Sequence, residues 1–279
     1  MCNATNKTRL HSLVAATAAF LSLSACGDKD ADAAGRLVAQ AQASLDRGDY
    51  DSAFIYLDSL SAAYPRQIEA GRRGLALRPR AIEGRTNQEI IELQCYLQAH
   101  QATADSLIRL FTATQPSEDV FEGYYMANDA PKNFRERNTA VARLTPSGEF
   151  YIISSLAGRT TQHTAISLTA DGRTATSGHV PFDPESMLSR ESVRFSAEKA
   201  DTIGSFACSI DHLVSSATLK FIGGKKTQSA TLSAKEIHAI ADTYRLSRSL
   251  SAISSTSKRL EQLKAKLQLA RDQQARQSE

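Results

Sequence analysis

His163 and His179 are the two side chains in this sequence whose type and position best suit a metal ion. They flank Asp171-Gly172, a dipeptide preferred in two-residue turns between antiparallel strands. Such a turn would place His179 directly opposite Thr164, one position out of step with His163. Neighbouring positions on a strand face opposite sides of a sheet, so the two imidazoles should diverge and should not share a zinc ion. The sequence therefore predicts no metal site.

Serine and aspartate residues are numerous around His212, and several could be drawn with it as a nucleophile, a base and an acid. At this density such sets arise by chance, because a triad is defined by its geometry and not by sequence position. The sequence contains no motif typical of an α/β-hydrolase, a zinc protease, a Walker loop or a dinucleotide-binding fold. We expect no catalytic residue and no cofactor.

Three acidic residues near the start of the chain invite comparison with a calcium site. Asp28, Asp30 and Asp32 alternate like the first three ligands of an EF-hand loop. Ala33 and Ala39 stand where that loop requires a glycine and a bidentate glutamate. The acids therefore indicate a solvated segment and not a calcium site.

Cys26 follows a segment with the three parts of a secretory signal. Lys7 and Arg9 give a positive start, residues 13–23 are apolar or small, and Leu23-Ser24-Ala25 precedes the cysteine. The apolar run is shorter than the ~20 residues that a membrane-spanning helix needs. We therefore expect residues 1–25 to be a signal peptide that is removed. An ordinary signal peptide with an incidental cysteine is the alternative.

The tetrapeptide ending at Cys26 resembles a bacterial lipobox. This resemblance implies that the Cys26 thiol is lipidated, that the chain is cut before it and that the new amine is acylated. Residues 26–35 would then be an acidic tether, similar to surface-export signals of some Gram-negative gut bacteria, and Gly27 departs from the best-known inner-membrane retention signal. The expected location is the outer membrane, with the protein lipid-anchored through Cys26 and either periplasmic or surface-exposed.

Composition limits the partners of the chain. The net charge of +3 includes Lys7 and Arg9 of the signal peptide, and so balanced a chain lacks the basic face that nucleic acid requires. There is no tryptophan, and aromatic residues make up 6% of the chain, which weighs against a sugar hydrolase. Cys95 and Cys208 could pair in an oxidising envelope, but they fall in different predicted segments, so their pairing stays open.

Residues 36–115 are predicted to be helical, and their first part has a recognisable pattern. Gly48-Asp49-Tyr50 forms a turn, Ala53 is a small residue where two helices would touch, and Pro65 ends the unit. Residues 36–65 thus resemble one tetratricopeptide repeat. No second copy follows, and such repeats normally need neighbours, so the resemblance implies a helical hairpin and not a peptide-binding array.

The rest of the helical region changes character along its length. Residues 66–84 should be an interrupted helix, because glycine and proline weaken or bend helices. The interrupting residues are Gly71, Gly74, Pro79 and Gly84. In residues 82–112, apolar positions step alternately by three and four, which predicts a seam helix that packs against a partner. His100 lies in this seam as a packing residue.

Residues 116–232 show the alternation of period two that is typical of antiparallel strands. Turns are expected at residues 146–148, at Asp171-Gly172 and at Gly223-Gly224, and a short helix over residues 198–208. We predict an antiparallel β domain with one covering helix.

Residues 233–279 contain neither glycine nor proline and are predicted to form a long helix. Ser233 and Glu236 have the spacing of a capping box at its start. A solitary helix of this length cannot bury its apolar stripe, so it should pack back on the preceding helices, residues 82–112 above all. The expected fold class is α+β.

The expected function is that of a lipid-anchored cell-envelope protein, non-enzymatic, that serves as a binding or scaffolding module with a protein partner in the envelope. In layout the chain resembles uncharacterised lipoproteins of gut bacteria. One alternative is an envelope assembly factor that docks proteins through its helical hairpin, similar to the repeat-bearing lipoprotein of the outer-membrane barrel-assembly machine. A further alternative is a hydrolase that uses the β domain.

Overall fold

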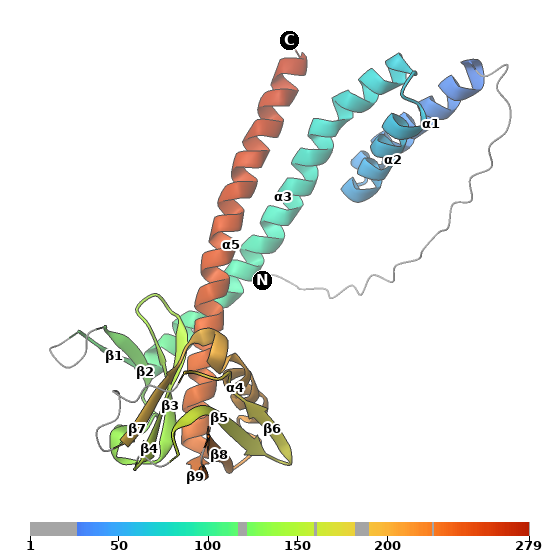
Figure 1. The fold of residues 1–279 in the computed structure, drawn as a ribbon. Helices are drawn as coiled ribbons and strands as arrows, with labels where there is room; N and C mark the ends of the chain where they lie inside the picture. The colour runs from blue at the N-terminus through green and yellow to red at the C-terminus, as the bar shows by residue number, and fades with distance from the viewer. Residues whose placement is uncertain (1–26, 117–121, 159–160, 182–189, 225, 279) are drawn as a thin grey trace. The chain divides into compact units, whose positions relative to one another are not determined.

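The computed structural model describes residues 27–278, except for 117–121, 159–160, 182–189 and 225. The chain divides into two compact units: Met1–Tyr96 with Thr256–Glu279, and Leu97–Ser255. Both divisions fall inside long helices, α3 (Ile68–Leu107) and α5 (Ala234–Ser278), so each of these helices contributes to both units (Figure 1). Among the described residues, no helix has the length and apolar character needed to cross a bilayer.

The first unit begins with a helical hairpin, as the sequence predicts. Helix α1 (Gly27–Asp46) is followed by a turn in which Gly48 has φ +71°. Asp49 caps α2 (Tyr50–Ala63), because its side chain accepts a hydrogen bond from the Ser52 N–H at 3.2 Å. Ala53 is fully buried where the two helices meet.

Helix α1 begins at Gly27, immediately after Cys26, so most of the expected acidic tether is helical. Residues 27–35 belong to the same helix as the first arm of the hairpin. A continuous helix cannot wrap its carboxylates around one ion as an EF-hand loop does.

Helix α3 corrects the expectation of an interrupted helix before residue 84. It runs without a break from Ile68 to Leu107 and contains Pro79. Two glycines that were expected to weaken it lie where α2 packs. A Cβ atom at Gly74 would come within 2.6 Å of Leu60, and one at Gly84 within 2.0 Å of Tyr50. Close helix packing thus stabilises a segment whose local propensity is poor.

The end of α5 lies in the same unit and packs against α3. Leu260 and Leu263 are buried. Arg259 donates to Glu89 at 2.7 Å and Arg271 to Glu83 at 2.9 Å. The prediction that the C-terminal helix packs on the preceding helices is confirmed.

The second unit contains two antiparallel sheets. The five-stranded sheet has the order β1-β2-β3-β4-β7, and the four-stranded sheet has the order β6-β5-β8-β9. The strands of the first are β1 (Phe111–Thr114), β2 (Tyr124–Ala127), β3 (Thr139–Leu144), β4 (Phe150–Ala157) and β7 (Arg190–Phe195). Those of the second are β5 (His163–Ala170), β6 (Arg173–Thr176), β8 (Ser216–Gly223) and β9 (Thr227–Ser233).

The start of the sheet region differs from expectation. The helix expected to reach residue 112 ends at Leu107, and a 3₁₀ turn (Ile108–Leu110) leads directly into β1. Strand β1 therefore precedes residue 116, where the β domain was expected to begin. The β-branched and aromatic residues of Phe111–Thr114 suit a strand better than a helix end.

The β5–β6 hairpin has the predicted register. Asp171 and Gly172 both have positive φ, +48° and +71°, as a type I′ turn requires. Strand pairing runs from Ala170 with Arg173 to Ser167 with Thr176.

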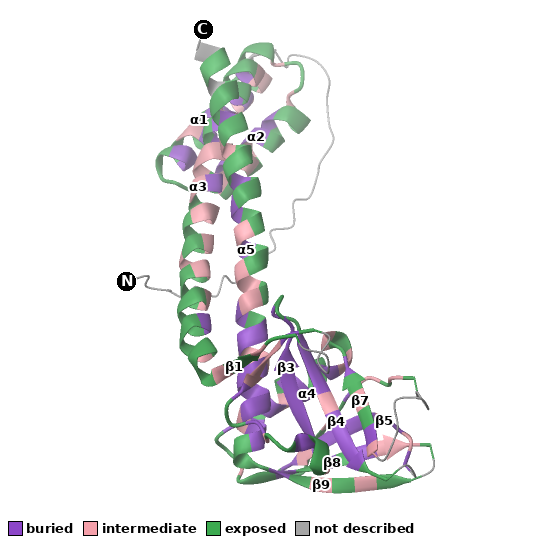
Figure 2. Ribbon diagram, turned by 90° about the vertical axis from the view of Figure 1, so that its left-hand side faces the viewer, coloured by how far each residue is buried: buried purple, intermediate pink, exposed green. Residues whose placement is uncertain are grey.

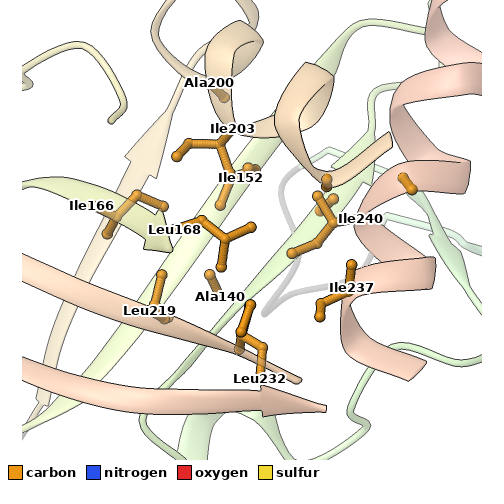
Figure 3. Packing of buried hydrophobic residues seen from close by; sticks show 14 of the residues in the cluster. Ala140, Ile152, Ile166, Leu168, Ala200, Ile203, Leu219, Leu232, Ile237 and Ile240 are labelled. Carbon is orange, nitrogen blue, oxygen red and sulfur yellow. The ribbon is translucent and has the colours of Figure 1, made fainter. Parts of the chain in front are cut away.

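One core joins the two sheets, α4 (Ala197–Ile210) and the first part of α5 (Figure 3). Ile152 of β4, Leu168 of β5, Ile203 of α4 and Ile240 of α5 are each at most 1% exposed. Within the second unit, Figure 2 shows buried residues concentrated on the strands and on this part of α5. The fold is α+β, and the first turns of the long terminal helix are part of the β domain's core.

The start of α5 has the predicted capping box. Glu236 accepts hydrogen bonds from the Ser233 backbone N–H at 2.9 Å and from its hydroxyl at 2.8 Å. This cap fixes where the helix begins, and so fixes which α5 side chains face α4.

Candidate functional site

The end of α4 places two titratable side chains next to α5. Asp211 caps the helix, and its backbone N–H donates to the Ala207 carbonyl at 2.9 Å. His212 follows with φ +61°, a left-handed conformation that is uncommon for a residue with a side chain. The Asp211 side chain is 2% exposed, whereas that of His212 is 74% exposed. The turn thus buries a carboxylate and leaves an imidazole at the surface.

Helix α5 supplies the other half of the cluster. His238, Asp242 and Arg245 are spaced by four and three residues, so they share one face of the helix. His238 Nδ1 lies 3.1 and 3.2 Å from the two oxygens of Asp211. Its Nε2 lies 3.1 Å from Asp242 Oδ2. The imidazole of His238 therefore lies between two carboxylates.

Arg245 completes the charge pairing. Its guanidinium donates to Asp211 Oδ2 at 2.7 Å and to Asp242 Oδ1 at 2.9 Å. Burial alone would raise the pKa of the Asp211 carboxyl, but hydrogen bonds from Arg245 and His238 outweigh it and hold that pKa below its ordinary value. Asp211 is consequently an anion at neutral pH.

A shallow groove of about 540 Å³ lies beside this cluster, within the second unit. One wall is formed by small and apolar residues of α3 and the following turn, among them Ala102, Leu107 and Leu110. The other wall carries the charged and imidazole side chains. Those side chains are His212, His238, Asp242 and Arg245. The groove can therefore offer apolar contact and charge-assisted hydrogen bonds to the same ligand.

His212, His238 and Asp211 are the residues of this site that could hold a metal. One ligand atom from each lies within 4.8 Å of the others. Two imidazoles and one carboxylate are a ligand set used by zinc and other first-row transition metals.

His163 and His179 do not come together on one site. The Nδ1 of His179 lies 3.1 Å from the Thr164 hydroxyl. The His163 ring is buried, with Nε2 at 2.7 Å from Ser154 Oγ and Nδ1 at 2.7 Å from Glu191 Oε2. Each histidine has its own partners: His163 lies on β5, and His179 lies beyond the end of β6 at Thr176.

Ser154, His163 and Glu191 have the connectivity of a serine, histidine and acid triad, which the sequence did not suggest. All three side chains are essentially inaccessible. The Phe221 ring packs edge-on against His163 at 5.3 Å between centroids. A nucleophile must meet its substrate, and a serine hydroxyl enclosed in this way does not.

The trio has a structural role instead. Ser154 and Glu191 belong to one sheet and His163 to the other. Glu191 also accepts backbone N–H groups of Thr161 at 2.9 Å and Gln162 at 2.7 Å. Satisfied polar networks of this kind specify one packing arrangement, and here the network ties the chain entering β5 to β7.

Part of the groove cluster could have been predicted from the sequence. The spacing of His238, Asp242 and Arg245 on a predicted helix shows that they share a face. That Asp211 and His212 meet this face depends on how α4 packs on α5, which no local pattern reveals. Cys26, the predicted lipidation residue, lies outside the described residues. Cys208 is a free thiol, so it does not pair with Cys95.

Comparison of the chain with protein-family models, with curated proteins and with solved structures finds no match in any of the three.

Proposed function

We propose that the protein is a lipid-anchored protein of the bacterial cell envelope that binds a partner protein through its β-rich unit. The lipobox-like tetrapeptide ending at Cys26 supports anchoring in the outer membrane. The binding role rests on one observation, the groove beside Asp211, His212 and His238, with its apolar wall and its charged wall.

The shape of the groove favours a polypeptide as the partner. Sites for small molecules are usually concave enough to bury most of the ligand, whereas this groove is open and shallow. Protein interfaces combine an apolar centre with a polar rim, and arginine is enriched in them. A segment of another envelope protein that carries apolar and charged side chains would match both walls.

A hydrolase is the less favoured interpretation of the β-rich unit. The arrangement nearest to catalytic machinery is the buried trio of Ser154, His163 and Glu191, which joins the two sheets. In the groove, the imidazoles of His212 and His238 contact the carboxylates of Asp211 and Asp242, and Ser106 is part of the groove lining.

The second candidate function is docking through the helical hairpin, as in an envelope assembly factor. A hollow of about 580 Å³ lies at the α1–α2 turn, and its lining includes Arg47, Asp51, Arg85 and Glu92. Arg85 and Asp51 pair at 3.4 Å with both side chains more than half exposed. This surface is polar and offers a partner less apolar area than the groove does.

Photo-crosslinking in intact cells tests the two surfaces against each other. A photoreactive residue is placed at Thr103 in the groove, at Gln88 in the hairpin hollow or at Lys220 on the exposed side of β8. We expect one discrete adduct from Thr103 and none from Lys220. An adduct from Gln88 alone would favour the assembly-factor role, and equal labelling at all three positions would contradict a specific groove.

A further inference from the structure

The cluster beside the groove holds the His238 ring between two carboxylates. Both nitrogens of the His238 ring lie within 3.2 Å of carboxylate oxygens, from Asp211 on one side and Asp242 on the other. An imidazole that binds a metal uses the lone pair of one nitrogen and keeps the N–H on the other. The position of the His238 ring suits this division, with Nδ1 beside Asp211 and Nε2 beside Asp242.

We propose that Asp211, His212 and His238 bind a divalent first-row transition metal, zinc(II) in particular, at the edge of the groove. His238 Nδ1 and Asp211 Oδ1 are 3.1 Å apart, and His212 Nε2 lies 3.3 Å from Asp211 Oδ2. Ligands at 2.0–2.1 Å from tetrahedral zinc are separated from each other by about 3.3–3.4 Å. The exposed His212 side chain can turn to complete the set.

Two further side chains, Asp242 and Arg245, contact two of the proposed ligands, His238 and Asp211. His238 Nε2 lies 3.1 Å from Asp242 Oδ2 in an ion-pair contact, close enough for this carboxylate to orient a metal-bound imidazole. Arg245 donates to Oδ2 of Asp211 and to Oδ1 of Asp242. Asp211 Oδ1 is therefore the oxygen open to the ion, and His212 Nε2, which lies 3.3 Å from Oδ2, must turn toward it. Asp242 and Arg245 are positioning residues in this site.

The backbone supports the same assignment. His212 lies in the left-handed region at φ +61°, which few residues other than glycine adopt and in which asparagine, aspartate and histidine are enriched. Residues held in such conformations cluster at functional sites, where the strain is stabilised by the surroundings. Here the unusual backbone brings the imidazole to Asp211 and to the His238 ring, whose centroid lies 4.8 Å from its own.

The inference goes beyond the proposed function, because partner binding in the groove requires no metal. A bound ion would border the groove, since His212 and His238 both line it. Sites with three protein ligands commonly leave a coordination position for water or a ligand group.

The test uses full-length protein purified without a histidine tag and treated with a chelator. Zinc chloride is titrated by calorimetry, and cobalt(II) serves as a spectroscopic probe of the coordination geometry. We expect one zinc ion per chain and the visible absorption of tetrahedral cobalt. His212→Asn, which suits the left-handed backbone, should lower zinc affinity at least tenfold, while the metal-free variant unfolds at the same denaturant concentration as the wild type.

His179→Asn is the matched control, because His179 is also exposed and follows the β5–β6 hairpin. It should bind zinc like the wild type. Asp242→Asn should weaken binding about 10–100-fold, as loss of an orienting carboxylate does, and should shift the cobalt spectrum. Equal zinc affinity of the His212 variant and the wild type would overturn the proposal, as would a wild type that binds no stoichiometric zinc at micromolar concentrations. Either result leaves crosslinking at Thr103 unaffected.

Discussion

Two residues of the buried trio Ser154, His163 and Glu191 should make the stability of the fold sensitive to acid. They are His163 and Glu191. Burial lowers the pKa of the His163 ring below its ordinary value of 6.5, and the charge of Glu191 opposes this only in part. For Glu191, burial would raise the pKa, but N–H groups of His163 and Gln162 outweigh it and lower that pKa below 4.5. Both groups therefore favour the fold at neutral pH.

We predict that the free energy of unfolding falls when the pH drops below about 6.5. In this range His163 binds a proton in the unfolded chain, whereas in the folded chain, where its pKa is lower, it binds one only at a lower pH. The slope contributed by one such group reaches about 1.4 kcal/mol per pH unit. Ionised Glu191 adds a second loss, which begins near its ordinary pKa of 4.5 and ends below its folded pKa. Denaturant unfolding at pH 7.5, 6.5 and 5.5 measures the slope.

His163→Gln should lower the free energy of unfolding at neutral pH and flatten its pH dependence between 6.5 and 5.5. His179→Gln, just beyond the same hairpin and exposed, should keep the wild-type slope. A residue-163 variant that retained the full slope would assign the acid sensitivity to another group.

At the scale of elements, two glycines distinguish the effect of helix propensity on stability from the effect of packing. They are Gly35 of α1 and Gly84 of α3. A Cβ atom at Gly84 would lie 2.0 Å from the Tyr50 ring, whereas one at Gly35 in α1 would meet nothing within 4 Å. Gly84→Ala should therefore destabilise the first unit by about 1–3 kcal/mol, because Tyr50 must move. Gly35→Ala should stabilise it by about 0.5–1 kcal/mol. Thermal unfolding of both variants measures the contrast, and a stabilised Gly84 variant would show that α2 does not dock there.

Helix α5 provides a second contrast between two leucines. Leu246 is fully buried in the β domain's core, whereas Leu269 is 59% exposed. Leu246→Ala should cost about 2–5 kcal/mol, and Leu269→Ala should change stability by less than about 0.5 kcal/mol. Denaturation monitored by far-ultraviolet circular dichroism measures both. Equal effects would mean that the first turns of α5 are not part of this core.

The elements divide into those that local chemistry specifies and those that packing decides. The Asp171-Gly172 turn and the Ser233–Glu236 cap act within a few residues, so the sequence predicted both. The continuity of α3 through Pro79 could not be predicted from the sequence. The sequence shows that glycine and proline weaken a helix, but it does not show that α2 packs on Gly74 and Gly84. The same limit applies to the groove, since α4 and α5 meet only in the folded chain.

In the whole molecule, the proposed membrane anchor and the proposed binding groove lie in different parts of the chain. The proposed anchor at Cys26 immediately precedes α1, and the groove belongs to the unit Leu97–Ser255. If both proposals hold, lipidation and partner binding reside in different parts of the chain and can be removed separately.

We predict that Cys26→Ala releases the protein from the membrane fraction. A single acyl chain binds membranes only marginally, and each buried methylene contributes ~0.8 kcal/mol, so several chains on one residue give stable attachment that the variant loses. The measurement is fractionation in high salt together with incorporation of labelled palmitate. Cys208→Ala is the matched control, because its free thiol lies in α4, and it should stay labelled and membrane-bound. A Cys26 variant that remained in the salt-washed membrane fraction would refute the lipid anchor, while the crosslink from Thr103 in the same cells would still report on the groove.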